Sequence, residues 1–452
     1  MCWHYRSGLY NRTELRNATY QVLKLSHCDL NNDKLDELDI LYRKLWPSPE
    51  NLDRIGEQLE FGRQMSGFTA NSNESKHIIY LPQGQDYWHV YEGDDAFRQC
   101  ASPHVGQTST NCHISHNKDS LRIASALVFR DHFSAYDPSP DERPPGQIWT
   151  YYTLESQANI RRHRFAHMSG QINWTATPRA DSDIVVPYGK IVRYDDPFSN
   201  LYVNSYKEGS CNVAKTVVEK TKLVVWVVSH CGGMARDEYV KQLQTYIQVD
   251  VFGACGAPCP TDHDDCITYI GKHYMFYLAF ENSLCRYYIS EKFFINALNN
   301  YLVPVVMGPP RHDYEALAPS ESFIHVDDFR SPKHLAQHLV YLSQNLDAYL
   351  RYFSWHSQAR LVDTAFWCRL CTLIHSVMPE PSFRTQKYRE DVSGNDNKVM
   401  LREKVFSRRQ VYHSLEHWWD ARNVCTKKQW INNSFVRNLA KTSSQYVLRW
   451  YN

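Results

Sequence analysis

The chain has 452 residues, of which 43% are hydrophobic and 22% are charged, and this composition excludes a protein that is mostly disordered. The 50 lysines and arginines nearly balance the 49 aspartates and glutamates, so the net charge of +1 argues against a protein built to bind the phosphates of nucleic acids. Residues 1–15 lack the apolar core of a signal peptide, and no apolar run reaches the roughly 18 residues of a transmembrane helix. We therefore expect a soluble chain or one that lacks an upstream segment.

Cysteines and glycosylation sequons indicate an oxidising compartment. The 13 cysteines are many for a cytosolic enzyme, and disulfides persist mainly in the secretory pathway. Asn-x-Ser/Thr sequons, which accept N-linked glycans there, occur at Asn11, Asn17, Asn73, Asn173 and Asn432. Together these features predict a glycoprotein of the secretory pathway. The odd cysteine count leaves at least one thiol that is free or paired with another chain.

The first 76 residues are polar and charged, and they predict a helical stem. Apolar residues recur there at three- and four-residue spacing in 35–45 and 52–61, which is typical of short helices. From residue 77 the pattern changes to apolar strands, which are predicted at 77–84, 125–133 and 183–189. Residues 77–210 are therefore interpreted as a first α/β domain.

A second α/β domain is predicted at 211–375. Its first strand, LVVWVVS at 223–229, is a continuous valine-rich run typical of a parallel strand buried on both faces. Further strands are predicted at 249–253, 274–282, 303–308 and 323–329, and helices at 238–247, 289–299 and 332–345. This alternation predicts a doubly wound parallel sheet, and ligands of such sheets bind at the carboxyl ends of the strands. Residues 376–452 form a charged and aromatic tail without a clear repeat.

The segment after the strand at 274–282 combines the residue types of an anion and sugar site. Ser290 is a plausible N-cap of the next helix, and Glu291 suits the positive end of that helix. Lys292 in the first turn offers a point charge for a phosphate, while Asn282 and Glu291 offer hydrogen bonds to sugar hydroxyls. The alternative is an ordinary solvated first turn.

Four segments in order resemble one known family. FENSLCRYYISEKFF at 280–294, followed by VPVVMG at 303–308, resembles the donor-binding motif of the α-1,3-fucosyltransferases, glycosyltransferase family ten. The other three segments similar to this family are GQIWTYYTLES at 146–156, INWTATPRADSDIVVPYG at 172–189 and LVVWVVSHCGGMARDEYV at 223–240. The resemblance spans residues 77 to 375.

The resemblance implies a B-type glycosyltransferase fold, in which two Rossmann-like domains face a cleft. It implies inverting transfer of fucose from GDP-β-L-fucose to the 3-hydroxyl of GlcNAc in a glycan or glycoprotein. The acceptor is either the core GlcNAc on asparagine or an antennary GlcNAc, and the tail is similar to those of invertebrate core-type members. Family members are usually type II proteins of the Golgi membrane that face the lumen; this chain lacks the anchor or is secreted. No tightly bound cofactor is implied, and a divalent cation such as manganese would at most stimulate the transfer reaction.

The same resemblance assigns roles to single residues. Glu155 matches the family's general base, since a carboxylate can take the acceptor proton; the alternative is a buried ion pair with Arg161 or Arg162. Arg236 and Lys292 match cationic positions at the diphosphate, although Arg236 alone would also fit a surface helix start. The remaining matches are Glu291 at the ribose, Tyr288 near the nucleotide and Asn282 near the fucose.

Two positions depart from the family pattern. Tyr287 stands where the family commonly has Asp, and Gln157 stands where it usually has Pro. These changes motivate an alternative function, a catalytically inactive member that binds nucleotide sugar or glycan. A protein-O-fucosylating relative is a weaker third option, because its donor loop differs from this one.

Metal chemistry is not favoured by the sequence. Asp262-His263-Asp264-Asp265 resembles a manganese-binding D-x-D motif, but it lies in a Pro-rich loop without a preceding strand. Cys255, Cys259 and Cys266 are more easily explained as disulfide cysteines than as zinc ligands in an oxidising compartment. Cys368 and Cys371 resemble a structural CxxC of the family, with Cys100 and Cys112 as the partners we expect. Residues 181–183 are interpreted as a turn, with shaping of the cleft as the alternative.

Overall fold

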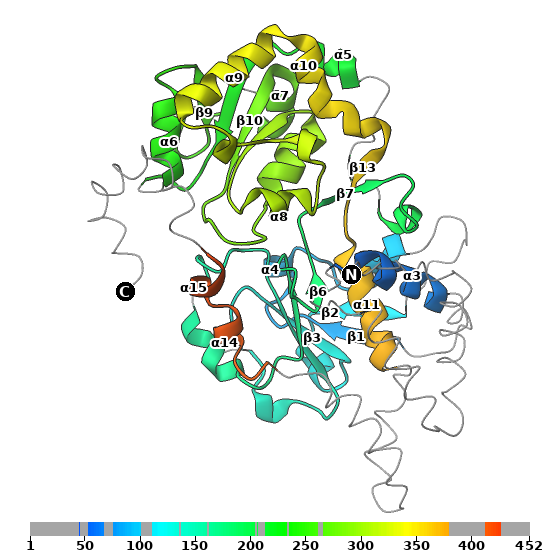
Figure 1. Cartoon of the computed structure of the whole chain (residues 1–452). Coiled ribbons are helices and arrows are strands. Elements are labelled where there is room, and N and C mark those ends of the chain that lie inside the picture. Colours follow the sequence, from blue (N-terminus) through cyan, green and yellow to red (C-terminus); the bar gives the residue numbers. More distant parts are fainter. Residues whose placement is uncertain are drawn as a thin grey trace, which may run out of the picture.

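The computed structural model describes part of the chain: residues 45, 53–66, 76–100, 111–134, 137–160, 162–203, 206, 213–232, 235–260, 265–378 and 412–425. Figure 1 shows two α/β domains; the middle of the chain, coloured green to yellow, forms the upper one, and the first part of the chain forms most of the lower one. Four of the five sequons, Asn11, Asn17, Asn73 and Asn432, lie outside the described residues, as do Asp262, His263 and Asp264.

The first domain is built on a sheet of six parallel strands in the order β2-β1-β3-β4-β5-β6. Its strands are nearly all buried, as expected for a parallel sheet covered on both faces. They are β1 (His77–Tyr80), β2 (Cys112–Ser115), β3 (Ala126–Arg130), β4 (Ile148–Tyr152), β5 (Trp174–Thr177) and β6 (Ile184–Val185). The covering helices are short and include α4 (Gln85–Trp88) and the 3₁₀ segments Asp95–Cys100, Lys118–Arg122, Pro140–Glu142 and Arg162–Met168.

The second domain holds a five-stranded parallel sheet in the order β12-β11-β10-β8-β9. The strands are β8 (Lys222–Val227), β9 (Val249–Phe252), β10 (Tyr274–Phe280), β11 (Val303–Met307) and β12 (Ile324–His325). The helices are α5 (Val213–Val218), α6 (Ala235–Leu243), α7 (Cys266–His273), α8 (Arg311–Glu315), α9 (Pro332–Gln344) and α10 (Leu346–Leu350). The predicted α/β class with parallel sheets is thereby confirmed.

The helix expected at 289–299 has an unusual form. Lys292–Ala297 is a π-helical segment and Leu298–Asn300 is a 3₁₀ turn. Phe293 and Phe294 are both fully buried in the second-domain core, so consecutive bulky side chains point inward. A wider helix accommodates both rings, and such π segments often occur at functional sites.

The last helix of the predicted second domain packs on the first domain. The chain returns through an antiparallel ribbon of β7 (Lys190–Arg193) and β13 (Ala359–Val362) and then forms α11 (Phe366–Val377). Leu370, Leu373 and Ile374 of α11 lie fully buried in the core of the first sheet. The physical reason for this difference from the boundary drawn at 375 is that α11 is buried on nearly all sides, at Phe366 and from Cys368 to His375, and it finds this burial between the first sheet and α3.

The helix α3 (Ile55–Ser66), expected as part of a stem, packs directly on α11. Gln58 is buried between them: its Nε2 donates to Leu45 O at 2.8 Å, and its Oε1 accepts from Arg369 Nη1 at 3.1 Å. Ile55 and Leu59 share a buried cluster with Cys368. This part of the predicted stem is therefore built into the first domain.

Gly62 marks the close approach of α3 to α11. A Cβ at this position would lie 2.2 Å from Thr372 Oγ1. Gly62→Ala is therefore expected to lower the free energy of unfolding by about 1–3 kcal/mol, because a well-packed contact does not accept an added methyl group. Gly62→Ala/Thr372→Ala should regain most of this loss, since it removes the clashing hydroxyl. Urea denaturation measures both variants, and wild-type stability of the single variant would contradict the packing described.

Candidate active site

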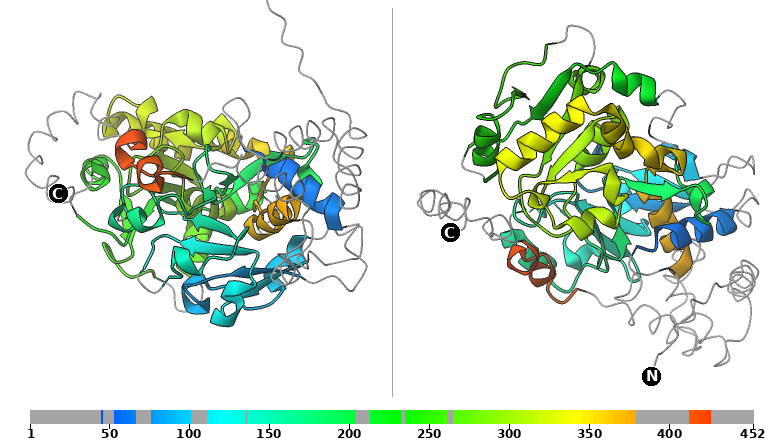
Figure 2. Two further views of the ribbon diagram at one scale, coloured as in Figure 1. Left: turned by 90° about the horizontal axis from the view of Figure 1, so that it is seen from below. Right: turned by 45° about the horizontal axis from the view of Figure 1, so that its top comes forward.

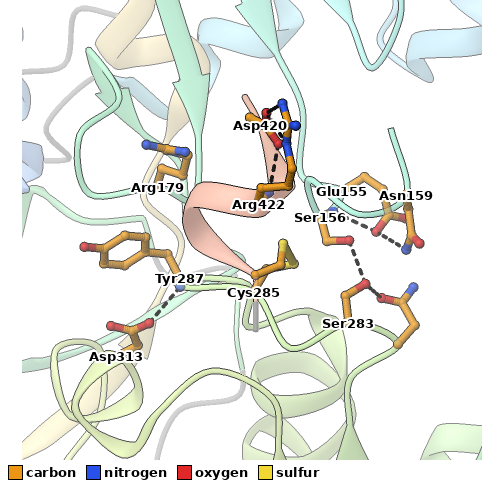
Figure 3. Close-up of a disulfide and its surroundings, with 12 residues drawn as sticks. Glu155, Ser156, Asn159, Arg179, Ser283, Cys285, Tyr287, Asp313, Asp420 and Arg422 are labelled. Carbon is orange, nitrogen blue, oxygen red and sulfur yellow. Dashed lines mark hydrogen bonds and ion pairs between the residues drawn. A yellow bond between two sulfur atoms is a disulfide. The ribbon is translucent and has the colours of Figure 1, made fainter. Parts of the chain in front are cut away.

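Two loops meet where the domains adjoin, one after β4 and one after β10. Ser156 Oγ and Ser283 Oγ lie 2.7 Å apart in a buried hydrogen bond, although 127 residues separate them in the chain. Ser283 Oγ also donates to Asn282 Oδ1 at 2.8 Å. Figure 3 shows this line of contacts from Glu155 and Ser156 to Ser283. Both loops follow the carboxyl ends of parallel strands, where α/β sheets bind their ligands.

Glu155 is partly exposed on the first-domain side of this contact. Its Oε1 accepts hydrogen bonds from Ser156 N at 2.8 Å and Asn159 Nδ2 at 3.1 Å. A carboxylate that is oriented in this way and still reachable from solvent can accept a proton from a bound hydroxyl. The alternative ion pair with Arg161 or Arg162 falls outside the described side chains.

A residue that the sequence did not single out supports Glu155. Glu155 N donates to Thr153 Oγ1 at 3.1 Å, and Thr153 Oγ1 in turn donates to Asp131 Oδ1 at 2.6 Å. Asp131 has a φ of 61°, a left-handed conformation that is uncommon outside glycine and tolerated by aspartate. Such backbone positions cluster at functional sites, but φ cannot be read from one sequence.

On the second-domain side, Glu281 organises the residues of the donor loop, which we define as residues 281–292. Its side chain is fully buried and accepts hydrogen bonds from Ser290 N at 2.8 Å and from Ser290 Oγ at 2.9 and 2.8 Å. Lys292 Nζ lies 3.4 Å from Glu281 Oε2 and 3.1 Å from Glu291 Oε1. The predicted N-cap role of Ser290 is confirmed: the helix begins at Glu291, Lys292 N donates to Ser290 Oγ at 3.4 Å and Phe293 N donates to Ser290 O at 3.1 Å. The same hydroxyl also donates to the Glu281 carboxylate.

Burial and charge act in opposite directions on this ion pair. Burial raises the pKa of Glu281, although the charge of Lys292 acts against that shift. Burial also acts to lower the pKa of Lys292, but the charges of Glu281 and Glu291 outweigh it, so this pKa is raised. Lys292 therefore stays protonated through the neutral range and provides a permanent positive charge.

Arg236, at the start of α6, is 4% exposed, so its interpretation as a surface residue is wrong. Its Nη1 donates to Phe280 O at 2.9 Å and its Nη2 donates to His230 O at 3.0 Å. Nε has no hydrogen-bond partner among the described residues. Burial lowers the pKa of Arg236, but an arginine remains charged at neutral pH. The guanidinium is thus held at the end of β10, and some of its N–H groups remain available to donate to a ligand.

Two tyrosines lie among the carboxylates of both domains. Burial raises the pKa of Tyr288, and the charges of Glu281 and Glu155 raise it further. Tyr188 is affected in the same way, by burial and then by Glu291, Glu155 and Glu281. The structure therefore brings Glu155 of the first domain and the acidic residues of the donor loop to one place.

Tyr287, the departure from the family pattern, has a φ of 65°. Its backbone N–H donates to Asp313 Oδ2 at 2.8 Å (Figure 3). Arg286 makes a bidentate ion pair with the same carboxylate. Asp313 on α8 is buried. The carboxylate of Asp313, which comes from α8, thus holds the backbone bend at Tyr287, the position where the family commonly has Asp.

Two family models match the chain. The model described as Glycosyltransferase family 10 (fucosyltransferase) C-term matches residues 217–390, and the model described as Fucosyltransferase, N-terminal matches residues 74–189. Glycoprotein 3-alpha-L-fucosyltransferase A of Drosophila melanogaster is 35% identical over 397 residues, which are 87% of this chain and 70% of that protein. The chain belongs to glycosyltransferase family 10, the fucosyltransferases.

A second relative and one crystal structure are also similar to the chain. Alpha-(1,3)-fucosyltransferase 7 of Rattus norvegicus is 37% identical over 318 residues, 69% of this chain and 72% of that protein. A crystal structure described as alpha1,3-Fucosyltransferase aligns with 14% identity and a TM-score of 0.48, over 68% of this chain and 92% of that chain. The resemblance stated from the four motifs is confirmed, and the chain is an enzyme of this family.

The disulfides of this fucosyltransferase agree with the expected oxidising compartment. The bonds Cys100–Cys368 and Cys112–Cys371 join the CxxC to the two partner cysteines that the family resemblance led us to expect. Three more bonds, Cys231–Cys255, Cys259–Cys266 and Cys285–Cys425, lie in the described residues. The zinc alternative for Cys255, Cys259 and Cys266 is therefore wrong.

The described residues contain one group with metal-ligand spacing, formed by Cys112, Cys371 and His375. Both of its cysteines are disulfide-bonded, which removes them as ligands. Of the D-x-D-like segment only Asp265 is described, and it caps α7 through bonds from Ile267 N and Thr268 N. Across the described part of the chain, no helix has the length and apolar character needed to cross a membrane.

Proposed function

We propose that this family 10 enzyme transfers L-fucose from GDP-β-L-fucose to the 3-hydroxyl of a GlcNAc residue in a glycoprotein or other glycoconjugate, with formation of an α-1,3 linkage. The observation that carries the proposal is the Ser156–Ser283 hydrogen bond, which holds the loop of Glu155 against the loop of Asn282. Both the Drosophila and the rat relative are named as 3-α-fucosyltransferases, which supports the α-1,3 linkage.

In the proposed reaction, the oxygen of the acceptor hydroxyl attacks C1 of fucose from the face opposite the leaving group, and Glu155 accepts the proton of that hydroxyl. The C1–oxygen bond to the diphosphate breaks, and its electron pair leaves with GDP, so the anomeric configuration inverts. Lys292 and the spare N–H groups of Arg236 stabilise the charge that develops on the diphosphate. Glu291 binds the ribose, Tyr288 lies near the nucleotide, and Asn282 hydrogen-bonds the fucose.

We place this reaction in the lumen of the Golgi, where family members usually work as type II membrane proteins, or after secretion. Five disulfides in the described residues support an oxidising compartment. No tightly bound cofactor is proposed, and manganese is at most a stimulator. Addition and chelation of manganese in the assay below test that point.

The test is product analysis by mass spectrometry. The purified protein is incubated with GDP-fucose and two acceptors, an asparagine-linked core glycopeptide and an antennary N-acetyllactosamine oligosaccharide. The expected result is the gain of one deoxyhexose on GlcNAc of one acceptor, and fragmentation identifies which. No gain on either acceptor, with GDP-fucose binding retained in calorimetry, would favour the alternative of an inactive family member that binds nucleotide sugar.

A further inference from the structure

A segment of the C-terminal tail reaches from the first domain to the donor loop. We call residues 412–425 the strap; it contains the short helices α14 (Leu415–Trp418) and α15 (Ala421–Val424). Figure 1 shows both helices against the first domain, and Figure 3 shows α15 between Arg179 on one side and Glu155 on the other. The family models end before the strap, at residue 390.

The first half of the strap is part of the first-domain core. Leu415 and Trp419 are at most 1% exposed and pack in the aromatic cluster that contains Phe129, Trp149, Tyr151 and Phe165. Tyr412 N donates to Ile172 O at 3.0 Å, and Tyr412 OH donates to Asp183 Oδ2 at 3.0 Å. This end of the strap is therefore firmly attached.

The turn at 181–183, predicted from the sequence, binds the strap as well. Ser182 N donates to Arg179 O at 3.1 Å, which confirms the turn. Arg179 Nη1 donates to Trp418 O at 2.9 Å, and the guanidinium carbon lies 4.4 Å from the centroid of the Trp418 ring. Trp418 Nε1 donates to Asp181 Oδ2 at 3.2 Å. Both aspartates of the turn thus contact the strap, Asp181 through Trp418 and Asp183 through Tyr412.

The far end of the strap is attached to the second domain by a covalent bond. Cys425 forms a disulfide with Cys285, which lies in the donor loop between Asn282 and Tyr288. Arg286 N donates to Val424 O at 2.9 Å and extends the contact. The loop that carries the proposed sugar contacts is therefore bonded to a segment whose other end is in the first domain.

Within the described residues, the polypeptide passes between the domains at the β7–β13 ribbon, which lies on the other side of the molecule. Figures 1 and 2 place β7, β13, α3 and α11 on the side opposite to α14 and α15 in each view. Two domains joined on one side only can rotate about that side as a hinge. A second connection on the opposite side restrains such a rotation and keeps the two loops of the site in contact.

We infer that the strap is a positioning element, in which the Cys285–Cys425 bond holds the donor loop against the first domain so that Asn282 stays aligned with Glu155. The inference rests on the proposed function of these two residues. Small errors in the placement of reacting groups reduce rates strongly, so loss of the bond acts on catalysis more than on nucleotide affinity.

The first test is peptide mapping of the wild-type protein without reduction, in which a linked peptide pair with Cys285 and Cys425 is expected. Free thiols at both positions would overturn the inference. The second test compares Cys285→Ser/Cys425→Ser with Cys259→Ser/Cys266→Ser, which removes another disulfide of the second domain as a matched control. We expect a fall in kcat of about 10- to 100-fold in the first variant only, with the affinity for GDP changed by less than about threefold.

Hydrogen exchange separates this inference from the proposed function, because it needs no acceptor. Amides of the donor loop are expected to exchange faster in Cys285→Ser/Cys425→Ser and unchanged in the control, even if the wild type transfers no fucose. Trp418→Phe, which keeps an aromatic ring beside Arg179 but loses the hydrogen bond to Asp181, should show the same change to a smaller extent and replaces the double variant if that variant does not fold. Unchanged exchange of the donor loop in these variants would show that the strap does not position it.

Discussion

Glu155→Gln is expected to reduce kcat for fucose transfer by about 10²- to 10⁴-fold, the usual contribution of a general base. Glutamine has the same shape, and its side-chain oxygen can still accept the hydrogen bonds from Ser156 N and Asn159 Nδ2. It cannot take a proton from the acceptor. The affinity for GDP should stay within about threefold of wild type, since Glu155 lies on the other domain from the cationic residues.

Steady-state kinetics and calorimetry with GDP measure these two quantities. Glu142→Gln is a matched control because it makes the same chemical change in an exposed capping box of the first domain. This control is expected to keep full activity. If Glu155→Gln kept more than about a tenth of the wild-type kcat, another group would have to be the base.

Lys292→Met is expected to weaken the binding of GDP strongly and to destabilise the fold at the same time. The variant removes the positive charge beside the proposed diphosphate position and leaves the buried Glu281 without its cationic partner. Loss of one member of a buried ion pair typically costs about 3–5 kcal/mol. Calorimetry with GDP and urea denaturation measure the two effects separately.

A double variant distinguishes the binding role of Lys292 from its structural role. In Lys292→Met/Glu281→Gln the buried carboxylate at position 281 is replaced by a neutral amide, so no unpaired charge remains there. Most of the lost stability should therefore return, while GDP binding stays weak. Lys190→Met, which removes a lysine paired with Asp53 away from the donor loop, should leave GDP binding unchanged. Recovery of GDP binding in the double variant would mean that Lys292 does not contact the diphosphate.

The pH dependence of Lys292→Met has a definite sign. Burial raises the pKa of Glu281, and loss of the Lys292 charge, which acts to lower it, raises this pKa further. A carboxyl with a raised folded-state pKa contributes stability at low pH and loses it as the pH rises through that pKa. Relative to wild type, the variant should therefore become more stable as the pH falls from about 8 toward the ordinary glutamate pKa of about 4.3.

Four of the five strands predicted in the second domain match the structure closely because their sequences are unusually informative. Of the fifth, predicted at 323–329, only Ile324–His325 is a strand, and Val326–Asp328 is a 3₁₀ turn. LVVWVVS and VPVVMG are continuous apolar runs, and such runs form strands buried on both faces wherever the chain places them. The position of the helix after the donor loop was predicted, but its π-helical and 3₁₀ geometry was not. Its π-helical geometry depends on how Phe293 and Phe294 share one core, which a helical pattern does not encode.

The sequence proposes candidate site residues but not how they are arranged. Glu155, Asn282 and Lys292 were identified from motifs, and the structure brings their loops together. Glu281 was not assigned a role, although its place at the end of an apolar strand was a usable signal for a buried acid. Asp131 gave no signal, since its importance rests on a backbone angle and on a hydrogen bond to Thr153.

By itself the sequence determined the α/β class, the parallel strands and the residues of the donor loop, because these depend on short patterns and local motifs. Only the tertiary structure decided which domain α11 completes, that Arg236 is buried, and that the strap is bonded to Cys285. Each of these depends on contacts between segments far apart in the chain, such as the 140 residues between Cys285 and Cys425. The free energy of these contacts comes from shape complementarity and burial between distant segments, which a local sequence pattern does not encode.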